Sequence, residues 1–144
     1  MAISRPRPPV VQQRMRDSCW AAVLESWSQV DPRVAAGSQD DLITLFGDAN
    51  GGINPATHVP LIASQYGLAW GGFPSGQLGA YVRQHLAASY IFCAHARVGY
   101  HHSVLIYQLD NGNVAYMDPD PGRYRTQPLS QLEVRGPFAL MRAR

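Results

Sequence analysis

The hydrophobic periodicity of the chain changes near residue 88, and this change limits the folds that the chain can adopt. Before that point apolar residues recur at helical spacing, as in the stripe of Trp20, Val23, Leu24 and Trp27. After it the sequence is typical of short strands, namely "SYIFCAHARV", "HSVLIYQL", "NVAYMD" and "FALMRAR". The Asn-Gly pair in "LDNGNV" predicts a tight hairpin between the second and third strands. Helices first and antiparallel strands second predict an α+β fold, with a cleft between the two halves.

Four helices are predicted in the first half of the sequence. Each has a start signal of the capping type: Asp17 or Ser18, Ser38 with Asp41, Asn54 with Pro55, and Ser75. Pro32 stops the first helix and Gly67 ends the third. A further short turn of helix is expected at "PLSQLE", before the last strand.

Bulk properties of the chain indicate one domain and identify no partner. The length is 144 residues, and the net charge of +2 comes with scattered arginines, so we expect no nucleic-acid partner. Residues 1–11, which contain the run "RPRPP", are predicted to form an extended N-terminal arm ahead of a domain at 12–144. No apolar run approaches the roughly 18 residues of a membrane span, and the start lacks a signal-peptide pattern. We therefore expect a cytoplasmic location in the producing cell.

Cys19 lies where a polar loop gives way to the first helix. There the free backbone N–H groups and the positive end of the helix dipole favour a thiolate. His102 starts a predicted strand and can act as a base, and either Asp118 or Asp120 can accept its Nδ1–H and orient the ring. Strict pairing across a two-residue turn sets His102 opposite residue 121, so Asp118 meets it only through a longer loop, a bulge or a diagonal approach.

Three further side chains are candidates for this site. Gln13 lies six residues before Cys19, and its amide can join the Cys19 N–H in stabilising the oxyanion formed when a thiolate attacks a carbonyl. His101 competes with His102, because strand alternation alone does not choose between them; the sixteen-residue spacing to the acid favours His102. Trp70, within the Gly-rich "AWGGFPSG", is predicted to lie in a loop and to line a substrate groove.

Other reactive residue types favour structural interpretations. Cys93 lies inside the apolar run "YIFCAHA" and is predicted to be a core residue. His85 lies on the apolar stripe of its helix, and His58 and His95 are isolated. The chain has no zinc-ligand spacing, and the acidic residues near the hairpin lack the EF-hand pattern. We therefore expect no metal and no cofactor.

The combination of these residues resembles a known family. Gln13, five intervening residues, Cys19-Trp20 at a helix start, a strand-start histidine and an acid sixteen residues later are similar to the pattern of the papain-like cysteine peptidases. Small bacterial members, including double-glycine leader peptidases and effector peptidases, are the most similar in length and in "MDPDPG". The resemblance implies Gln13 as oxyanion donor, Cys19 as nucleophile, His102 as general base and acid, and Asp118 as the orienting residue.

The resemblance spans about residues 12 to 140 and has departures. Papain has an asparagine as the third triad member and a disulfide-bonded cysteine just upstream of the nucleophile, whereas this chain has Asp118, Asp17 and Ser18 at these places. The double-glycine peptidases have glycine after the nucleophile, where this chain has Trp20. The fold implied is a helical half, with the catalytic cysteine at a helix N-terminus, packed on a C-terminal antiparallel sheet.

The function implied by the resemblance is a cysteine peptidase that hydrolyses peptide bonds in a peptide or protein substrate. The resemblance also allows a bacterial effector or toxin, secreted by a non-classical route, with an inhibitor or immunity protein as partner. Two alternatives stay open. One is a cysteine amidase that cleaves cell-wall peptidoglycan with the same chemistry, and the other is a catalytically silent module of the same fold that binds peptides.

Overall fold

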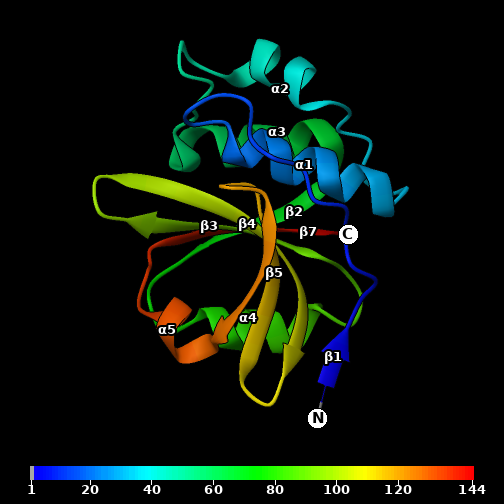
Figure 1. Ribbon diagram of the computed structural model, residues 1–144, viewed down its shortest axis with the longest axis vertical. Coiled ribbons are helices and arrows are strands. Elements are labelled where there is room, and N and C mark those ends of the chain that lie inside the picture. The colour runs from blue at the N-terminus through cyan, green and yellow to red at the C-terminus, as the bar shows by residue number, and fades with distance from the viewer. Residues whose placement is uncertain (1) are drawn as a thin grey trace.

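The computed structural model describes residues 2–144, which form a seven-stranded sheet with helices on both faces (Figure 1). In chain order the elements are β1 (Ala2–Ser4), α1 (Cys19–Val30), α2 (Gln39–Phe46), α3 (Pro55–Tyr66), β2 (Leu68–Phe73), α4 (Leu78–His85), β3 (Ile91–Arg97), β4 (Tyr100–Asp110), β5 (Asn113–Asp118), β6 (Arg123–Pro128), α5 (Leu129–Glu133) and β7 (Phe138–Ala143). The predicted order of helices followed by antiparallel strands is therefore largely present.

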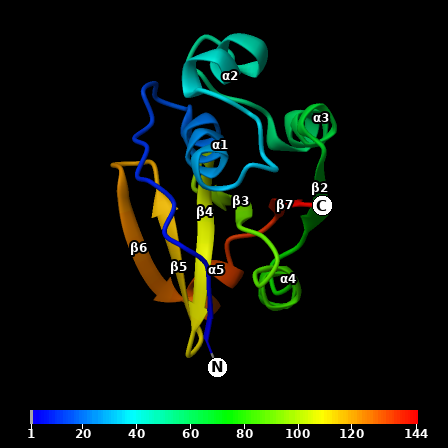
Figure 2. The same ribbon diagram turned by 90° about the vertical axis from the view of Figure 1, so that its right-hand side faces the viewer.

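The sheet is antiparallel throughout, in the strand order β2-β7-β3-β4-β5-β6. Strand β4 is the longest, and β3 pairs only with its first part, up to Ile106. Strand β1 pairs with the last part of β4, from Gln108 to Asp110. Figure 2 shows β1 running beside this end of β4. The N-terminal strand thus extends the sheet where β3 has ended.

The predicted hairpin between β4 and β5 is confirmed. Asn111 and Gly112 form its two-residue turn, with φ angles of 51° and 77°. This is the left-handed backbone that makes Asn-Gly a favoured pair in tight hairpins. The pairing then shifts by one residue at a β-bulge between Ile106 and Gln108. The shift changes which residues of the two strands lie opposite one another farther along.

Two hydrophobic cores lie on opposite faces of the sheet. Helices α1 and α3 pack on one face, with α2 against α1, and α4 and α5 cover the other face (Figures 1 and 2). In β3, Phe92 and Ala94 belong to the first core, whereas Ile91 and Cys93 belong to the second. Because both faces are covered, β3 reads in sequence as one continuous apolar run. The second helical layer was not predicted.

Of the helix caps predicted from the sequence, two are confirmed and one is wrong. The side chains of Ser38 and Asn54 each accept a hydrogen bond from a backbone N–H in the first turn of α2 and α3. Helix α4 begins only at Leu78, whose N–H donates to the Glu133 carboxylate of α5 at 2.7 Å, and its N-cap residue Gln77 makes no side-chain capping bond. The Ser75 hydroxyl instead accepts a hydrogen bond from the N–H of Gly136, 2.9 Å away. Ser75 thus links two loops.

Three strands were missed, and one of them carries Trp70. The loop predicted around Trp70 is wrong, because Leu68–Phe73 form β2 and pair with β7 along their whole length. Gly71 and Gly72 lower the intrinsic strand preference of this segment, and pairing with β7 overrides that preference. Strands β1 and β6 were missed because most of their side chains are exposed or half-buried and give no clear apolar alternation.

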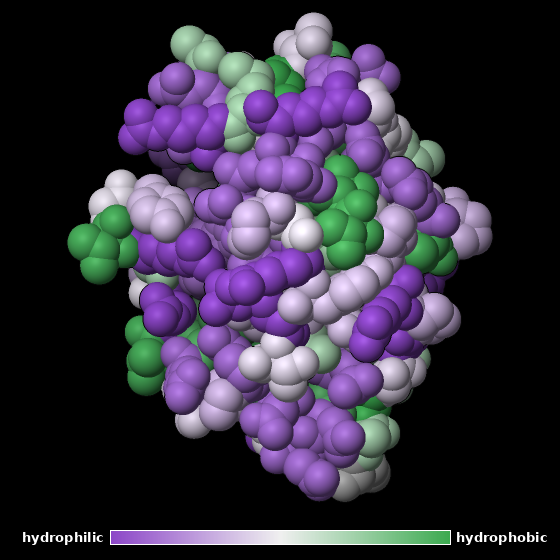
Figure 3. Space-filling model, viewed as in Figure 1, coloured by the Kyte–Doolittle hydropathy of each residue, from purple (hydrophilic) through white to green (hydrophobic). Residues whose placement is uncertain are grey.

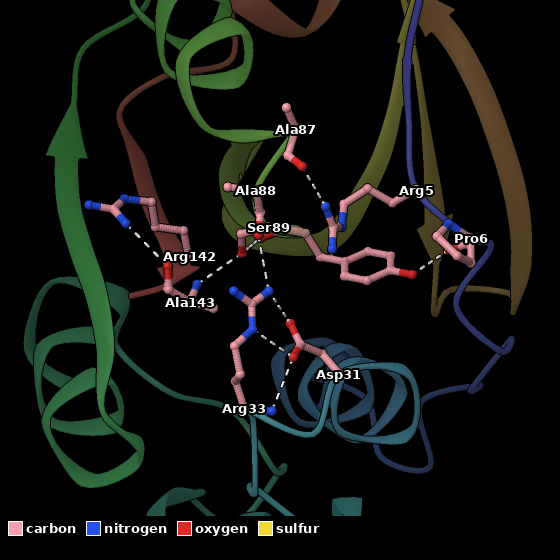
Figure 4. A network of polar contacts seen from close by, with 10 residues as sticks. Arg5, Pro6, Asp31, Arg33, Ala87, Ala88, Ser89, Arg142 and Ala143 are labelled. Carbon is pink, nitrogen blue, oxygen red and sulfur yellow. Dashed lines mark hydrogen bonds and ion pairs between the residues drawn. The ribbon is translucent and has the colours of Figure 1, made fainter.

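The N-terminal arm lies against the rest of the chain. Arg5 donates to the backbone oxygen of Ala87 at 2.8 Å, and the Tyr90 hydroxyl donates to the backbone oxygen of Pro6 at 2.5 Å (Figure 4). The Arg5 guanidinium also lies 5.0 Å from the centre of the Tyr90 ring, a cation–π distance. The division between an arm at 1–11 and a domain at 12–144 stays a prediction.

A neighbouring polar network joins the end of α1 to the segment before β3 (Figure 4). Arg33 makes a two-pronged ion pair with Asp31, at 3.0 and 2.9 Å, and also donates to the backbone oxygen of Ala88. Ser89 accepts a hydrogen bond from the Ala143 N–H of β7. These bonds hold α1, the α4–β3 connection and β7 together at one end of the molecule.

On the face shown in Figure 3, hydrophilic side chains cover most of the surface and apolar ones occur as separate patches. None of the helices within residues 2–144 has the length and apolar character to cross a membrane.

The packing of α1 in the first core should contribute strongly to stability, and a matched pair of leucines tests this. Leu24 of α1 is fully buried in that core, whereas Leu45 of α2 is 64% exposed. We expect Leu24→Ala to lower the free energy of unfolding by about 2 to 5 kcal/mol, because it removes buried methyl groups and leaves a cavity. Leu45→Ala should change it by less than about 0.5 kcal/mol. Denaturant unfolding measures both, and equal losses would contradict the packing of α1.

Candidate active site

Cys19 is the first residue of α1 and opens onto a cleft. It is largely buried and lines two adjoining cavities of about 430 and 270 Å³. Ser18 stands at the cap position of α1, but its side chain makes no capping bond and instead donates to Gln39 at 2.7 Å. The first-turn N–H groups of α1 are therefore not covered by a side chain. They supply hydrogen-bond donors and positive partial charge beside the sulfur.

The loop that leads into α1 is held by a side chain that sequence analysis missed. Gln39, the first residue of α2, is buried, and its Oε1 accepts hydrogen bonds from the Ser18 hydroxyl and the Arg14 N–H. Its Nε2 donates to the backbone oxygen of Gln12 at 3.1 Å. One amide therefore ties both ends of this loop to α2. In the sequence Gln39 is only a polar residue at the start of a helix, and that position does not indicate this role.

His102 and Asp118 form a buried hydrogen-bonded pair. The Nε2 atom of His102 lies 2.7 Å from Oδ1 of Asp118, and the two side chains are 2% and 0% exposed. The prediction that Nδ1 makes this bond is wrong; Nε2 makes it, so Nδ1 is the free ring nitrogen. Asp120 is not the side chain that binds His102. Its backbone N–H instead donates to the same Oδ1 of Asp118, at 3.0 Å.

The bulge in β4 explains why Asp118 meets His102. Before the bulge the strands pair Ile106 with Tyr116, one residue out of step with the hairpin turn. Continued at this register, His102 lies opposite residue 120, and Asp118 is its diagonal neighbour on the same face. From the sequence, a bulge and a diagonal approach were among the ways in which Asp118 could meet His102. The structure has both.

The Cys19 thiol and the His102 ring meet at the smaller cavity. Both line it, and the thiol lies close enough to the ring to raise the pKa of His102, although no well-aligned S–H···N hydrogen bond joins them. Burial lowers the pKa of His102, but the bond to Asp118 and the contact with Cys19 outweigh burial and raise it above its ordinary value. The sulfur, imidazole and carboxylate therefore lie in one chain of contacts.

Asp118 is also held from its other side. Its Oδ2 lies 3.5 Å from a guanidinium nitrogen of Arg125 and 4.0 Å from one of Arg97. Burial raises the pKa of Asp118, but the hydrogen bonds from His102 and Asp120 and the positive charge of Arg97 lower it below its ordinary value. Asp118 is therefore ionised at neutral pH. Neither arginine was singled out from the sequence.

Gln13 lies beside Cys19 but is engaged elsewhere. It lines the smaller cavity with Cys19 and His102. Its Nε2 donates to the backbone oxygens of Met15 and Arg16, at 3.2 and 2.8 Å, so both amide hydrogens are directed at the loop. To donate to an oxyanion, the Gln13 amide must break one of these two hydrogen bonds and make one to the substrate oxygen instead. Its role as oxyanion donor stays a prediction.

His101 and Trp70 line an apolar cavity next to the cleft. This cavity has a volume of about 560 Å³, and apolar side chains dominate its wall; Trp70, which is 49% exposed, and Phe73 and Phe138 belong to it. It shares Asn54, Pro55 and His101 with the larger cavity at Cys19. The two cavities therefore adjoin, and we call them together the groove.

Cys93 lies in the second core, as predicted, and is fully buried. Burial raises the pKa of its thiol far above the ordinary value, so this thiol stays protonated. Within residues 2–144 no cluster of three or more His, Cys, Asp or Glu side chains is arranged to hold a metal ion.

Comparison with solved structures identifies the fold. The peptidase domain of Streptococcus ComA, a bi-functional ABC transporter involved in quorum sensing, matches with a TM-score of 0.71 at 18% identity, over 96% of this chain and 100% of that domain. The chain has the fold of a C39 peptidase domain. The papain-like α+β fold predicted from the sequence is thereby confirmed.

Two further structures share the C39 fold. A double-glycine motif protease from an AMS/PCAT transporter, solved in complex with the leader peptide, has a TM-score of 0.69 at 19% identity, over 98% of this chain and 95% of that one. A C39-like peptidase from Bacillus anthracis has a TM-score of 0.74 at 12% identity, over 100% of this chain and 98% of that one. No protein-family model and no curated protein matches the chain in sequence.

The His102–Asp118 pair of this C39 fold predicts a specific pH response. We expect Asp118→Asn to lower the titration midpoint of His102, measured by NMR, because burial then acts without the carboxylate that offsets it. Asp120→Asn should leave the midpoint nearly unchanged, since Asp120 contacts Asp118 only through its backbone. If Asp120→Asn lowered the titration midpoint of His102 and Asp118→Asn did not, the pairing of His102 with Asp118 would be contradicted.

The His102–Asp118 pair also determines the direction in which the stability of the fold changes with pH. The pKa of His102 is higher in the folded than in the unfolded protein. The stability that this residue contributes is therefore fully present below its unfolded pKa of about 6.5, and it is lost as the pH rises through the folded pKa. The melting-temperature difference between wild type and Asp118→Asn should therefore be largest near pH 6 and should narrow at alkaline pH. A difference that widens with rising pH would contradict this assignment.

Proposed function

We propose that this protein is a cysteine peptidase that hydrolyses peptide bonds through Cys19, His102 and Asp118. The observation that carries the proposal is the buried His102–Asp118 pair with the Cys19 thiol beside the same ring, at a helix N-terminus that opens onto a groove. A nucleophile, a base in contact with it and an acid that orients the base are the elements of thiol acyl transfer. The likeness to the folds of C39 peptidase domains supports the proposal.

In the proposed mechanism each side chain has a step. His102 takes the thiol proton on Nδ1, the nitrogen that Asp118 leaves free, and the thiolate attacks the carbonyl carbon of the scissile bond. The imidazolium then protonates the leaving amine as the C–N bond breaks, which leaves a thioester on Cys19. A water molecule that loses its proton to His102 hydrolyses the thioester and restores the thiol. Asp118 stays ionised and stabilises the imidazolium at each stage.

The groove supports a peptide as the substrate. Its apolar part, beside Trp70 and Phe138, suits the apolar side chains of a peptide better than the sugars of peptidoglycan. We therefore propose Trp70 as a substrate-binding residue and favour peptide hydrolysis over the amidase alternative. An effector or toxin role, an inhibitor or immunity partner and the cellular compartment remain predictions of the sequence.

Activity of three variants on protein and on peptidoglycan tests the proposal. Cys19→Ala should abolish protein hydrolysis, and His102→Ala should lower its rate by about 10² to 10⁴-fold through loss of the general base. His101→Ala, a matched change at the adjacent exposed histidine, should keep kcat close to wild type, and because His101 lines the groove only KM should change. Circular dichroism checks the fold of each variant.

Several outcomes would overturn parts of this proposal. A parental rate for His102→Ala, or a loss in His101→Ala in its place, would reject the assigned base. Turnover of peptidoglycan without turnover of protein would favour the amidase. Peptide binding without turnover of either substrate would favour the silent binding module.

The oxyanion role of Gln13 has its own test. If its amide exchanges a loop oxygen for the substrate oxyanion, Gln13→Ala should lower kcat by about 10² to 10³-fold. Asp17→Asn provides a control in the same loop, since Asp17 also lines the cleft without an assigned chemical role. An unchanged kcat for Gln13→Ala would leave Gln13 as a brace of the loop only.

A further inference from the structure

A separate polar cavity lies behind Asp118, on the side away from Cys19. It has a volume of about 250 Å³ and is built by β3, β5, β6 and the loop after α5. We call it the arginine pocket, and its lining residues are His95, Arg97, Tyr116, Arg125, Gln127 and Arg135. None of these residues has a direct part in the proposed reaction, so the pocket needs its own explanation.

The arginine pocket carries more positive than negative charge. Arg97 and Arg125 both face a single carboxylate oxygen, Oδ2 of Asp118, at 4.0 and 3.5 Å, and that carboxylate also binds His102. Arg135 makes no ion pair within residues 2–144. Two guanidinium groups thus share one already engaged carboxylate, and the third has no carboxylate partner. A cavity walled by such groups attracts anions.

The charges of the arginines that line the cavity act on two buried side chains of the same cavity. Burial lowers the pKa of His95 to about 4, and the positive charges of Arg97 and Arg135 lower it further, so His95 is neutral at pH 7. Burial raises the pKa of Tyr116, and Arg125, Arg97 and Arg135 all oppose that rise. The positive charge of Arg135 therefore affects both His95 and Tyr116.

A largely buried tyrosine lines the arginine pocket, and its hydroxyl has no protein partner. Tyr116 is 3% exposed as a residue, yet its hydroxyl makes no hydrogen bond to any group of residues 2–144. Because this oxygen is not sealed from solvent, it is free to donate to a ligand that enters the cavity. A free O–H in a cavity lined by three arginines suits a ligand that is an acceptor with negative charge.

We propose that the arginine pocket binds a compact oxyanion of the phosphate or sulfate type. The guanidinium of Arg135 and the hydroxyl of Tyr116 are its main donors, and Arg97 and Arg125 contribute positive charge while they hold Asp118. Planar guanidinium groups present paired N–H donors that match the oxygen spacing of such anions. The cavity volume of about 250 Å³ is large enough for such an anion. Anion binding here does not depend on the proposed peptidase activity.

Titration of the full-length Cys19→Ala variant with sodium phosphate tests the proposal. Isothermal calorimetry and NMR amide shifts are recorded at constant ionic strength, with chloride as the balancing salt. We expect saturable binding at one site, with amide shifts in β3, β5 and β6. Arg135→Gln should weaken phosphate affinity about tenfold or more, because it removes the charged donor without an internal partner. Arg83→Gln, an equal charge change on exposed α4, should leave it unchanged.

Tyr116→Phe and a second ligand sharpen the test. The Tyr116→Phe variant keeps the ring and removes only the hydroxyl, so it should also weaken phosphate binding. Titration with phosphoserine distinguishes a free anion from a phosphoryl group carried by another molecule: stronger binding than phosphate would identify the attached group as the ligand class. Absence of saturable binding by either probe, or equal affinity in wild type and Arg135→Gln, would overturn the proposal.

Discussion

The hydrogen bond between His102 and Asp118 is the interaction on which the rest of the site depends. Both groups are removed from water, so neither is stable there without the other: burial opposes ionisation of the carboxylate and protonation of the ring. Their bond outweighs that opposition and fixes which ring nitrogen is free. Only with Nε2 occupied by Asp118 does Nδ1 remain for the Cys19 thiol.

The fold supplies this bond through a defect in an otherwise regular sheet. The β-bulge between Ile106 and Gln108 moves the pairing of β4 and β5 by one residue and makes Asp118 the diagonal neighbour of His102. The cysteine comes from a different layer, at the start of α1, whose position is set by the first core and by the buried Gln39 amide. The site thus requires the sheet and the helical layer to be packed together.

Periodicity, spacing and turn signals predicted much of this from the sequence. The α1 stripe, the Asn-Gly hairpin and the α2 and α3 caps are local features, and the residues that create them are adjacent in the chain. The sixteen-residue spacing led to His102 and Asp118, which the structure places together. The spacing could not show which ring nitrogen faces the carboxylate, because that depends on how the His102 ring is turned between groups from distant parts of the chain.

The features that sequence analysis missed depend on long-range contacts. The glycines of β2 disfavour a strand in isolation, and it is the distant strand β7, through pairing, and α3, through packing, that stabilise it. Gln39 gave no signal because its partners lie far away in the chain. Arg97 and Arg125 come from β3 and β6 and converge on Asp118 only after the sheet has formed.

The most direct test of this account is the alkylation rate of the two cysteines by iodoacetamide at pH 7, followed by mass spectrometry in wild type and in His102→Ala. If His102 activates the thiol, Cys19 should react much faster than the buried Cys93, and His102→Ala should slow Cys19 without affecting Cys93. An alkylation rate of Cys19 that is the same with and without the imidazole would contradict the account.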